Sequence, residues 1–373
     1  MDNAISRAVS HLFSNNAIRS AQYDLNILAD LTGKVALVTG ANSPLGIGWN
    51  IAYQLALKGA KVYIHARTLE KAQAGIDAIL ADSLANHHIN PSSSRQVSAE
   101  QLVPFVVDLG KLTAVRDAAR NLLRKEARLD ILVHNAAVLA YGLELNEYGI
   151  STSMTINHIA PFLLTLELLP LLKKTSQSHP GVRIVTLSSI AHTLIPPSDA
   201  RLDTLQSFNN DFGERDGVEA NIKRYGYSKL ANILFAKELQ RKFDEASLPA
   251  ISVAVHPGLV RTDGFMNNVG PENKSQLDYA ETPLQGALAP LFAAAAAEVW
   301  TEKEEGSEKL KWAGAYVMPY GIPSPVDESE AAKDPKLAKE LWETTSRILA
   351  EQVGISVAFE STLWSLCISI SQF

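Results

Sequence analysis

Short apolar runs rich in β-branched residues alternate along this chain with longer segments of helical pattern. Runs of this kind are typical of parallel strands that are buried on both faces of a sheet. Parallel strands need crossover connections, and helices usually supply them. We therefore expect an α/β fold, a doubly wound parallel sheet of Rossmann type. The predicted strands are residues 34–39, 61–66, 102–107, 129–133, 182–187, 251–255 and 314–318.

Helical patterns occupy the intervals between these strands. They cover residues 47–58, 68–84, 112–127, 150–174, 222–243, 287–298 and 337–352. Because no repeat or domain-scale linker interrupts the alternation, we expect a single domain over 31–352, with extensions at 1–30 and 353–373. Loops are predicted at 85–101, at 196–221 and at the Gly/Asn-rich 262–285, the last two beside the substrate.

Composition narrows the functional classes. The net charge of −6 gives no basic footprint for nucleic acid. The one cysteine, Cys367, excludes an intrachain disulfide and favours a reducing, cytoplasmic location. The N-terminus lacks the apolar run of a secretory signal, and a mitochondrial presequence is the minor alternative. The apolar tail after Ile355 is too short and polar for a transmembrane span, which favours docking on the protein itself, a partner or a membrane surface.

A glycine-bearing turn separates the first strand from the first helix. It contains Gly40, Ser43, Gly46, Ile47 and Gly48. Glycines let the backbone approach a pyrophosphate closely, and the helix start offers unpaired N–H groups and a positive dipole end. An ordinary βα turn is the alternative, but the position is the one that a dinucleotide-binding motif requires.

The end of the second strand discriminates between cofactors. An acidic residue there would hold the ribose 2′-hydroxyl of NAD. Here the strand ends at His65 and Ala66 and is followed by Arg67, which can pair with a 2′-phosphate. We therefore predict NADP(H) as cofactor, with NAD(H) less favoured; a solvated surface arginine is the alternative.

Two further strand ends carry polar or small residues. Asp108 and Leu109 follow the third strand, and Asn135, Ala136 and Ala137 follow the fourth. The ligand of an open α/β sheet lies across the carboxyl ends of its strands, so Asp108 is placed to touch the adenine and Asn135-Ala136 to pass under the cofactor. Local turn or cap roles are the alternative.

Tyr225 and Lys229 are four residues apart on a predicted helix and share one face. A free tyrosine titrates near pH 10, and a neighbouring ammonium lowers that pKa towards the range useful for proton transfer. Tyr227 is the weaker candidate, because its own i+4 residue is Ala231. A solvated amphipathic face is the alternative for any isolated pair.

Two more polar residues complete a possible site. Ser189 follows the fifth strand and can hydrogen-bond a substrate oxygen; Ser188 competes, but only one of two successive residues faces the crevice. Asn157 lies inside a predicted helix, where asparagine is unfavourable, so we expect a polar role such as binding a water at a bend.

The order of these motifs resembles the short-chain dehydrogenase/reductase family. Residues 225–239 are most similar to its retinol dehydrogenase-like branch and many fungal, NADP-dependent relatives. The resemblance covers about residues 31–262 and thins towards 352. The matching pieces are Thr39-Gly40, Gly46-Ile47-Gly48, Asp108, residues 134–137, Asn157, Ser189, residues 225–229, Pro257-Gly258, Val260 and Thr262.

The resemblance implies a role for each catalytic residue. Tyr225 would be the general acid/base, Lys229 would bind the nicotinamide ribose and lower the pKa of Tyr225, Ser189 would orient the substrate oxygen, and Asn157 would hold a water in a proton relay. A turn would cover the nicotinamide with Pro257, Gly258, Val260 and Thr262.

Two motifs depart from the family pattern. The turn has two more residues than usual between Gly40 and Gly46, and Ala136-Ala137 replaces the usual alanine-glycine step. We expect an NADP(H)-dependent carbonyl reductase or alcohol dehydrogenase for a small-to-medium apolar substrate, of a kind used in secondary metabolism. A non-catalytic NADP-binding sensor or scaffold, and a nucleotide-sugar epimerase or dehydratase, are the alternatives. No HExxH or paired-cysteine motif predicts a metal site. Substrate, reaction direction and oligomeric state stay open.

Overall fold

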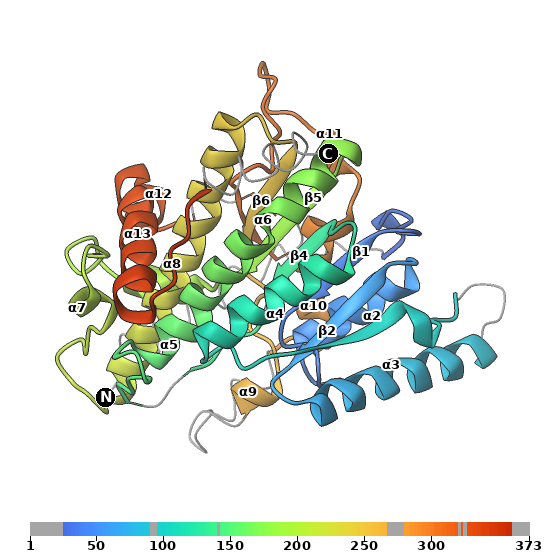
Figure 1. Cartoon of the computed structure of the whole chain (residues 1–373), viewed down its shortest axis with the longest axis horizontal. Coiled ribbons are helices and arrows are strands. Elements are labelled where there is room, and N and C mark those ends of the chain that lie inside the picture. The colour runs from blue at the N-terminus through green and yellow to red at the C-terminus, as the bar shows by residue number, and fades with distance from the viewer. Residues whose placement is uncertain are drawn as a thin grey trace, which may run out of the picture.

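The computed structural model describes residues 25–89, 95–139, 142–266, 280–319, 322–323 and 327–359. A sheet of strand order β3-β2-β1-β4-β5-β6-β7-β8 runs through the centre of the molecule (Figure 1). Strands β1 to β7 are parallel, and β8 pairs antiparallel with β7 at the edge. The strands are β1 Val35–Val38, β2 Lys61–Ala66, β3 Leu102–Val106, β4 Ile131–His134, β5 Val182–Leu187, β6 Ala250–Val255, β7 Tyr316–Met318 and β8 Ile322–Pro323.

The strand order reverses direction between β1 and β4. Ligands of open α/β sheets bind outside the carboxyl ends of the strands at such a switch point. The predicted doubly wound fold of Rossmann type is therefore confirmed, and it directs attention to the loops that follow β1, β4 and β5.

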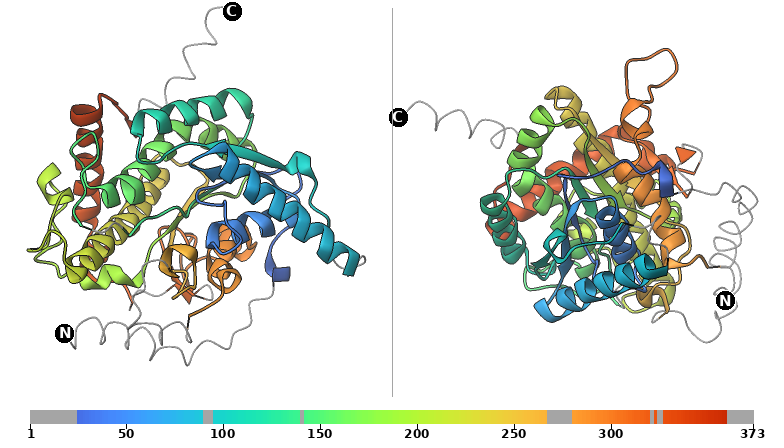
Figure 2. Two further views of the ribbon diagram at one scale, coloured as in Figure 1. Left: turned by 90° about the horizontal axis from the view of Figure 1, so that it is seen from below. Right: turned by 90° about the vertical axis from the view of Figure 1, so that its right-hand side faces the viewer.

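Helices cover both faces of the sheet, as the left view of Figure 2 shows. Helices α2, α3 and α10 pack on one face, where they share a core with β1 and β2. Helices α4, α6 and α8 pack on the other. Their bounds are α2 Ile47–Leu57, α3 Leu69–Ile89, α4 Leu112–Lys125, α6 Ala160–Ser178, α8 Val218–Glu245 and α10 Pro283–Ala295.

The helix before β5 is unusually apolar. It consists of α5 (Thr152–Met154), the π-helical turn η4 (Thr155–Ile159) and α6. Its length and composition would allow it to cross a membrane, but 83% of the apolar window is buried inside the protein. Within the residues that the structure describes, this segment is a core helix, which explains its composition without a membrane.

Segments at both ends pack on this core. Leu28 pairs with Ala296 after α10, and Leu31 is buried. At the other end α12 (Glu330–Lys333) and α13 (Pro335–Ile348) lie against α8 (Figure 1). The tail residues 360–373, for which surface docking was predicted, and most of the predicted N-terminal extension lie outside the described residues.

Three predicted loops contain more helix than expected. Helix α3 continues to Ile89, because its last turns keep helical contacts such as the bond from Asn86 Nδ2 to Asp82 Oδ2. Helix α10 starts at Pro283, where Thr282 and Gln285 form a capping box. The 196–221 insertion holds a short helix, α7 (Leu205–Phe208), and ends in the first turn of α8. The domain limits predicted from the sequence stay a prediction.

Candidate active site

The glycine turn after β1 is shaped by two close approaches. Gly40 has φ +67, a left-handed conformation that favours glycine, and an added Cβ would lie 3.0 Å from the Ala136 Cα atom. A Cβ at Gly48 would lie 2.3 Å from Asn135 Nδ2 and 2.5 Å from the Gly40 oxygen. Only glycine at both positions lets the start of α2 close onto the segment that follows β4.

The N-terminus of α2 is open to a ligand. Gly46 precedes the helix in an extended conformation and has no side chain that could cap it. The backbone N–H groups of the first turn, starting at Ile47, therefore remain able to donate to a ligand. These donors and the positive end of the helix dipole favour a phosphate. Ser43 is engaged differently, since its hydroxyl donates to the carboxylate of Asp263 at 2.6 Å.

Asn135 braces the glycine turn from β4. Its side-chain nitrogen donates to the carbonyl oxygens of Thr39, at 2.8 Å, and Gly40, at 3.2 Å. In return the Thr39 hydroxyl accepts from the backbone N–H groups of Asn135 and Ala136. The predicted cofactor residues Gly40, Asn135 and Ala136 thus form one hydrogen-bonded unit at the switch point.

His65 is a residue of this edge that sequence reasoning passed over. The Gly40 N–H donates to its Nδ1 at 2.8 Å, so Nε2 carries the proton and donates to the Val107 oxygen at 3.0 Å. Burial lowers the pKa of His65 to about 4, which keeps the ring neutral. The available sequence signal is a histidine near the end of a predicted buried strand.

Arg67 and Asp108 lie at the same edge. Arg67 is exposed, and its charge is close enough to act on the pKa of His65. Asp108 is half-buried, and its Oδ1 accepts from the Gly110 N–H at 2.9 Å. This bond within the turn is the local role that is the alternative to adenine binding. The predicted cofactor residue Leu109 is buried. This edge of the sheet therefore carries an exposed cation, Arg67, and a carboxylate, Asp108, that is partly engaged in its own turn.

The chemical residues meet beyond the carboxyl end of β5. Tyr225 and Lys229 lie on α8, and the Lys229 amine is 5.3 Å from the centre of the Tyr225 ring. The same amine donates to the Leu187 oxygen at 2.9 Å. The Ser189 hydroxyl is close enough to Tyr225 to lower the pKa of the phenol. The structure therefore brings Ser189, Tyr225 and Lys229 together.

The pKa shifts differ from the expectation for Tyr225. Burial raises the pKa of Tyr225 to about 12, partly offset by hydrogen bonding with Ser189. Burial also lowers the pKa of Lys229 to about 7. The predicted lowering of the tyrosine pKa by a neighbouring ammonium is wrong in this structure, because desolvation disfavours the charged form of both groups. Tyr225 holds its proton at neutral pH.

The two serines after β5 have separate tasks. Ser188 is buried, and its hydroxyl donates to the Lys229 oxygen at 2.7 Å. Ser189 is partly exposed, and its oxygen accepts from the Ala191 N–H at 3.2 Å. Ser188 therefore fixes α8 to the sheet, while Ser189 is the hydroxyl that faces Tyr225.

Asn157 lies in the π-helical turn η4, a feature that is frequent at functional sites. Its Oδ1 accepts from the Val138 N–H at 2.8 Å, and its Nδ2 donates to the Val138 oxygen and to Ser228 Oγ, both at 2.9 Å. Ser228 Oγ in turn donates to the backbone carbonyl oxygen of Tyr225, one turn earlier on α8. These contacts commit the side chain to bracing α8, and the expected relay water at Asn157 stays a prediction.

The turn after β6 completes the edge. Gly258 has φ +89, which favours glycine, and Pro257 precedes it. Val260 is buried against α10, where a Cβ at Gly286 would lie 2.4 Å from Val260 Cγ2. The Thr262 N–H donates to the Val260 oxygen. The predicted nicotinamide cover is therefore fixed to α10 beside the end of β5.

Gly226 is a second residue that sequence reasoning passed over, although it stands between the two tyrosines. An added Cβ would lie 2.3 Å from the Ala191 oxygen. Its absence lets α8 approach the turn that starts at Ser189. Glycine inside a predicted helix was the available signal, because such a residue usually has a packing reason.

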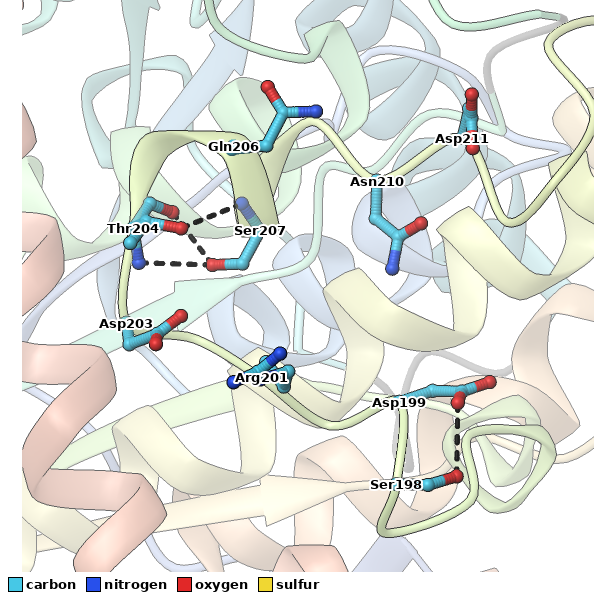
Figure 3. Close-up of a pocket in the computed structure, with 9 residues that line it drawn as sticks. All are labelled: Ser198, Asp199, Arg201, Asp203, Thr204, Gln206, Ser207, Asn210 and Asp211. Carbon is cyan, nitrogen blue, oxygen red and sulfur yellow. Dashed lines mark hydrogen bonds between the residues drawn. The ribbon is translucent and has the colours of Figure 1, made fainter.

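The 196–221 insertion forms a depression of its own, with a volume of about 530 Å³ (Figure 3). The lining is polar and includes no predicted catalytic or cofactor residue. Tyr227 reaches this insertion, since its hydroxyl donates to the Arg201 oxygen. The depression is lined by Ser198, Asp199, Arg201, Asp203, Thr204, Gln206, Ser207, Asn210 and Asp211.

Comparison with known proteins identifies the family. Residues 34–197 match the family model described as short chain dehydrogenase. A short-chain dehydrogenase/reductase of Armillaria gallica is 39% identical over 337 residues, covering 88% of this chain and 96% of that protein. The human dehydrogenase/reductase SDR family member 13 is 32% identical over 326 residues, covering 86% of this chain and 74% of that protein.

A solved structure agrees. The crystal structure of an uncharacterized protein from Mycobacterium paratuberculosis has 26% sequence identity and a TM-score of 0.61, covering 87% of this chain and 97% of that chain. The chain belongs to the short-chain dehydrogenase/reductase family, as the motifs predicted. It is an oxidoreductase of a family that binds nicotinamide cofactors and acts on small substrates.

Proposed function

We propose that this chain is an NADP(H)-dependent carbonyl reductase or alcohol dehydrogenase that acts on a small-to-medium apolar substrate. The observation that carries the proposal is the meeting of Ser189, Tyr225 and Lys229 beside a glycine turn at the switch point. The single cysteine of the sequence supports a cytoplasmic setting.

The residues present fit a dinucleotide phosphate. Gly40 and Gly48 let the turn and the start of α2 pack closely against Asn135 and Ala136, and the start of α2 at Ile47 offers uncapped N–H groups. Arg67 is exposed at the end of β2, where a 2′-phosphate would be recognised by a charge-assisted pair. When bound, the nicotinamide supplies the hydride.

The chain itself supplies proton chemistry and orientation. With a pKa of about 12, Tyr225 is protonated at neutral pH and can donate to a carbonyl oxygen as that oxygen gains charge. Ser189 can donate a second hydrogen bond to the same oxygen. The Lys229 amine, 5.3 Å from the centre of the Tyr225 ring, would bind the ribose hydroxyls of a bound nicotinamide nucleotide. This arrangement favours the reductive direction.

The test is a cofactor-consumption screen of the purified protein against a library of aldehydes and ketones, with NADPH and NADH compared at equal concentration. We expect NADPH oxidation with at least one apolar carbonyl, faster than with NADH. Tight NADPH binding with no oxidation across the library would instead support the sensor hypothesis.

Arg67 gives a separate prediction on cofactor choice. Replacing Arg67 by Glu removes a charge-assisted bond to phosphate worth about 1.5–3 kcal/mol, so the Kd for NADPH should rise about 10- to 100-fold. The Kd for NADH should stay within about twofold of the wild-type value, because NADH carries no 2′-phosphate. Isothermal titration of both cofactors measures this.

The matched control is Arg124→Glu. It makes the same charge change near the end of α4, away from the strand ends. Equal weakening of NADPH binding by both variants, or none by Arg67→Glu, would contradict the assignment of Arg67.

A further inference from the structure

We propose that His192 is a positioning residue for Ser189, and that through His192 the C-terminal part of the chain takes part in building the substrate end of the site. We call Ser189 and the short helix η5 (Ile190–Leu194) the serine turn. This inference rests on the proposed function, because it assigns a task to the turn that carries Ser189.

His192 bridges two backbone groups that are far apart in the sequence. Its Nδ1 lies 2.8 Å from the Ser189 oxygen, and the Ser329 N–H donates to its Nε2 at 3.1 Å. A backbone N–H can only donate, so Nε2 is the acceptor and the proton sits on Nδ1. The same tautomer then donates to the Ser189 carbonyl, and both bonds require it.

The ring has little freedom to turn. His192 is fully buried and meets the Tyr316 ring of β7 edge-on, with centroids 5.1 Å apart and planes at 74°. Burial, together with the nearby charge of Lys237, lowers the pKa of His192 to about 4, so the ring is neutral at neutral pH. The bridge therefore has one orientation and one protonation state.

The serine turn is held from two sides. Helix α8 approaches it at Gly226, where an added Cβ would meet the Ala191 oxygen at 2.3 Å. His192 holds it from the other side through Ser329, whose own hydroxyl accepts from the Ala332 N–H and caps α12. Tyr225 lies on α8 and Ser189 lies within the serine turn. The distance between their side chains therefore depends on both the Gly226 contact and the His192 contact.

An apolar side chain would fill the same space but leave the half-buried Ser329 N–H without this partner, and the Ser189 carbonyl would keep only the His192 backbone N–H, at 3.2 Å. Without the shorter of its two hydrogen bonds, the Ser189 carbonyl would be held less firmly, and a rotation of its peptide group would turn the serine hydroxyl. A small displacement of the Ser189 hydroxyl should weaken catalysis, which depends on its position, more than it weakens cofactor binding.

Three substitutions separate the two bonds. In His192→Asn the amide nitrogen falls near Nδ1 and can donate to the Ser189 oxygen. In His192→Gln the amide falls near Nε2 and can accept from Ser329, and His192→Phe can do neither.

With a carbonyl substrate found in the screen, we expect kcat to fall about 10- to 100-fold in the Gln and Phe variants at unchanged Kd for NADPH. His192→Asn should recover most of kcat. Wild-type kcat in His192→Phe, or equal loss in His192→Asn and His192→Phe, overturns the proposal.

A second measurement needs no turnover. Nitrogen-15 NMR of histidine-labelled wild-type protein at pH 7, with the His192 signal assigned by its loss in His192→Asn, should show a neutral ring protonated at Nδ1. A ring protonated at Nε2, or a charged ring, overturns the proposal. Absence of turnover in the wild type would contradict the proposed function alone, because the tautomer is read independently.

Discussion

Lys229 is a buried amine, whereas an amine in water is ordinarily a cation. Its side chain lies within the fold, and burial lowers its pKa to about 7 from the ordinary lysine value of 10.5. The Leu187 oxygen that accepts from it also accepts from Asn232 Nδ2 at 3.0 Å. Lys229 is therefore not needed to pair that carbonyl. Its burial lowers the free energy of unfolding, so we expect its position to have a functional reason.

Replacing Lys229 by Met should raise stability and abolish activity. Below pH 7 the lysine is charged in both the folded and the unfolded states, so the full penalty of burying the charge applies. Between pH 7 and 10.5 the folded state binds fewer protons than the unfolded state, so wild-type stability rises and the advantage of Met shrinks. We expect Lys229→Met to gain about 1–4 kcal/mol at pH 6 and less at pH 9.5.

Denaturant unfolding at the two pH values measures the difference. A gain that is the same at pH 6 and pH 9.5 would show that the charge of Lys229 is not the source, and a loss of stability at pH 6 would contradict the account of its burial.

Much of the site could be predicted at the residue scale, because strand ends and an i, i+4 pair are local patterns. Ser189, Tyr225 and Lys229 do come together at one edge. The pKa of Tyr225 could not be predicted in this way, since it depends on how deeply the ring is buried. His65 and His192 were missed for a similar reason: their partners, Gly40 and Ser329, are distant in the sequence.

At the scale of elements, two glycines set how closely helices approach the site. Gly48 fits the start of α2 against Asn135, and Gly226 fits α8 against the serine turn. The first contact lies at the cofactor end and the second at the chemical end. Each glycine therefore supports a different half of the site.

Substitution of each glycine by alanine should affect different measurements. We expect Gly48→Ala to raise the Kd for NADPH about tenfold or more, because overpacking costs about 1–3 kcal/mol at the cradle. Gly226→Ala should mainly lower kcat, with the Kd for NADPH within about twofold, because it separates Tyr225 from the serine turn.

Gly264→Ala is the matched control, since an added Cβ there meets its nearest neighbour, Thr262 Oγ1, at 3.9 Å. We expect it to change neither quantity. If Gly48→Ala and Gly226→Ala changed both measurements alike, the division of the site into two halves would be wrong.

At the scale of the whole molecule, the C-terminal helix α13 adds a layer outside α8 (Figure 1). Trp342 holds α13 in place. Its ring centroid lies 4.8 Å from that of Phe162 and 6.1 Å from that of Phe235, and the Lys242 amine lies 4.8 Å from the centre of its ring. His158, buried in the same cluster, bonds to Thr345 of α13.

Trp342→Ala should therefore lower the free energy of unfolding by about 3–5 kcal/mol. Lys339→Ala, on the exposed side of α13 in a pair 3.8 Å from Glu343, should change it by less than about 1 kcal/mol. Urea unfolding of the three proteins measures both values. A small effect of Trp342→Ala would mean that α13 contributes little to the stability of the core.

The central parallel sheet could be predicted from the sequence, but the strand at its edge could not. Alternating apolar runs and helical patterns depend on local sequence, and they located β1 to β7. The antiparallel strand β8 is two residues long and carries no such pattern. The turn η4 at Asn157 could be predicted only as an unfavourable helix position, since its geometry follows from the packing of α8 against the segment after β4.

The central claim is that Tyr225 donates the proton during carbonyl reduction, and Tyr227 offers a matched control two residues away. Tyr227 is buried with its hydroxyl on the Arg201 oxygen, so Tyr227→Phe loses a structural bond only. With NADPH and a carbonyl from the screen, Tyr225→Phe should lower kcat about 10²- to 10⁴-fold at unchanged Kd for NADPH. Tyr227→Phe should keep kcat within about threefold of wild type. Full turnover by Tyr225→Phe would contradict the account.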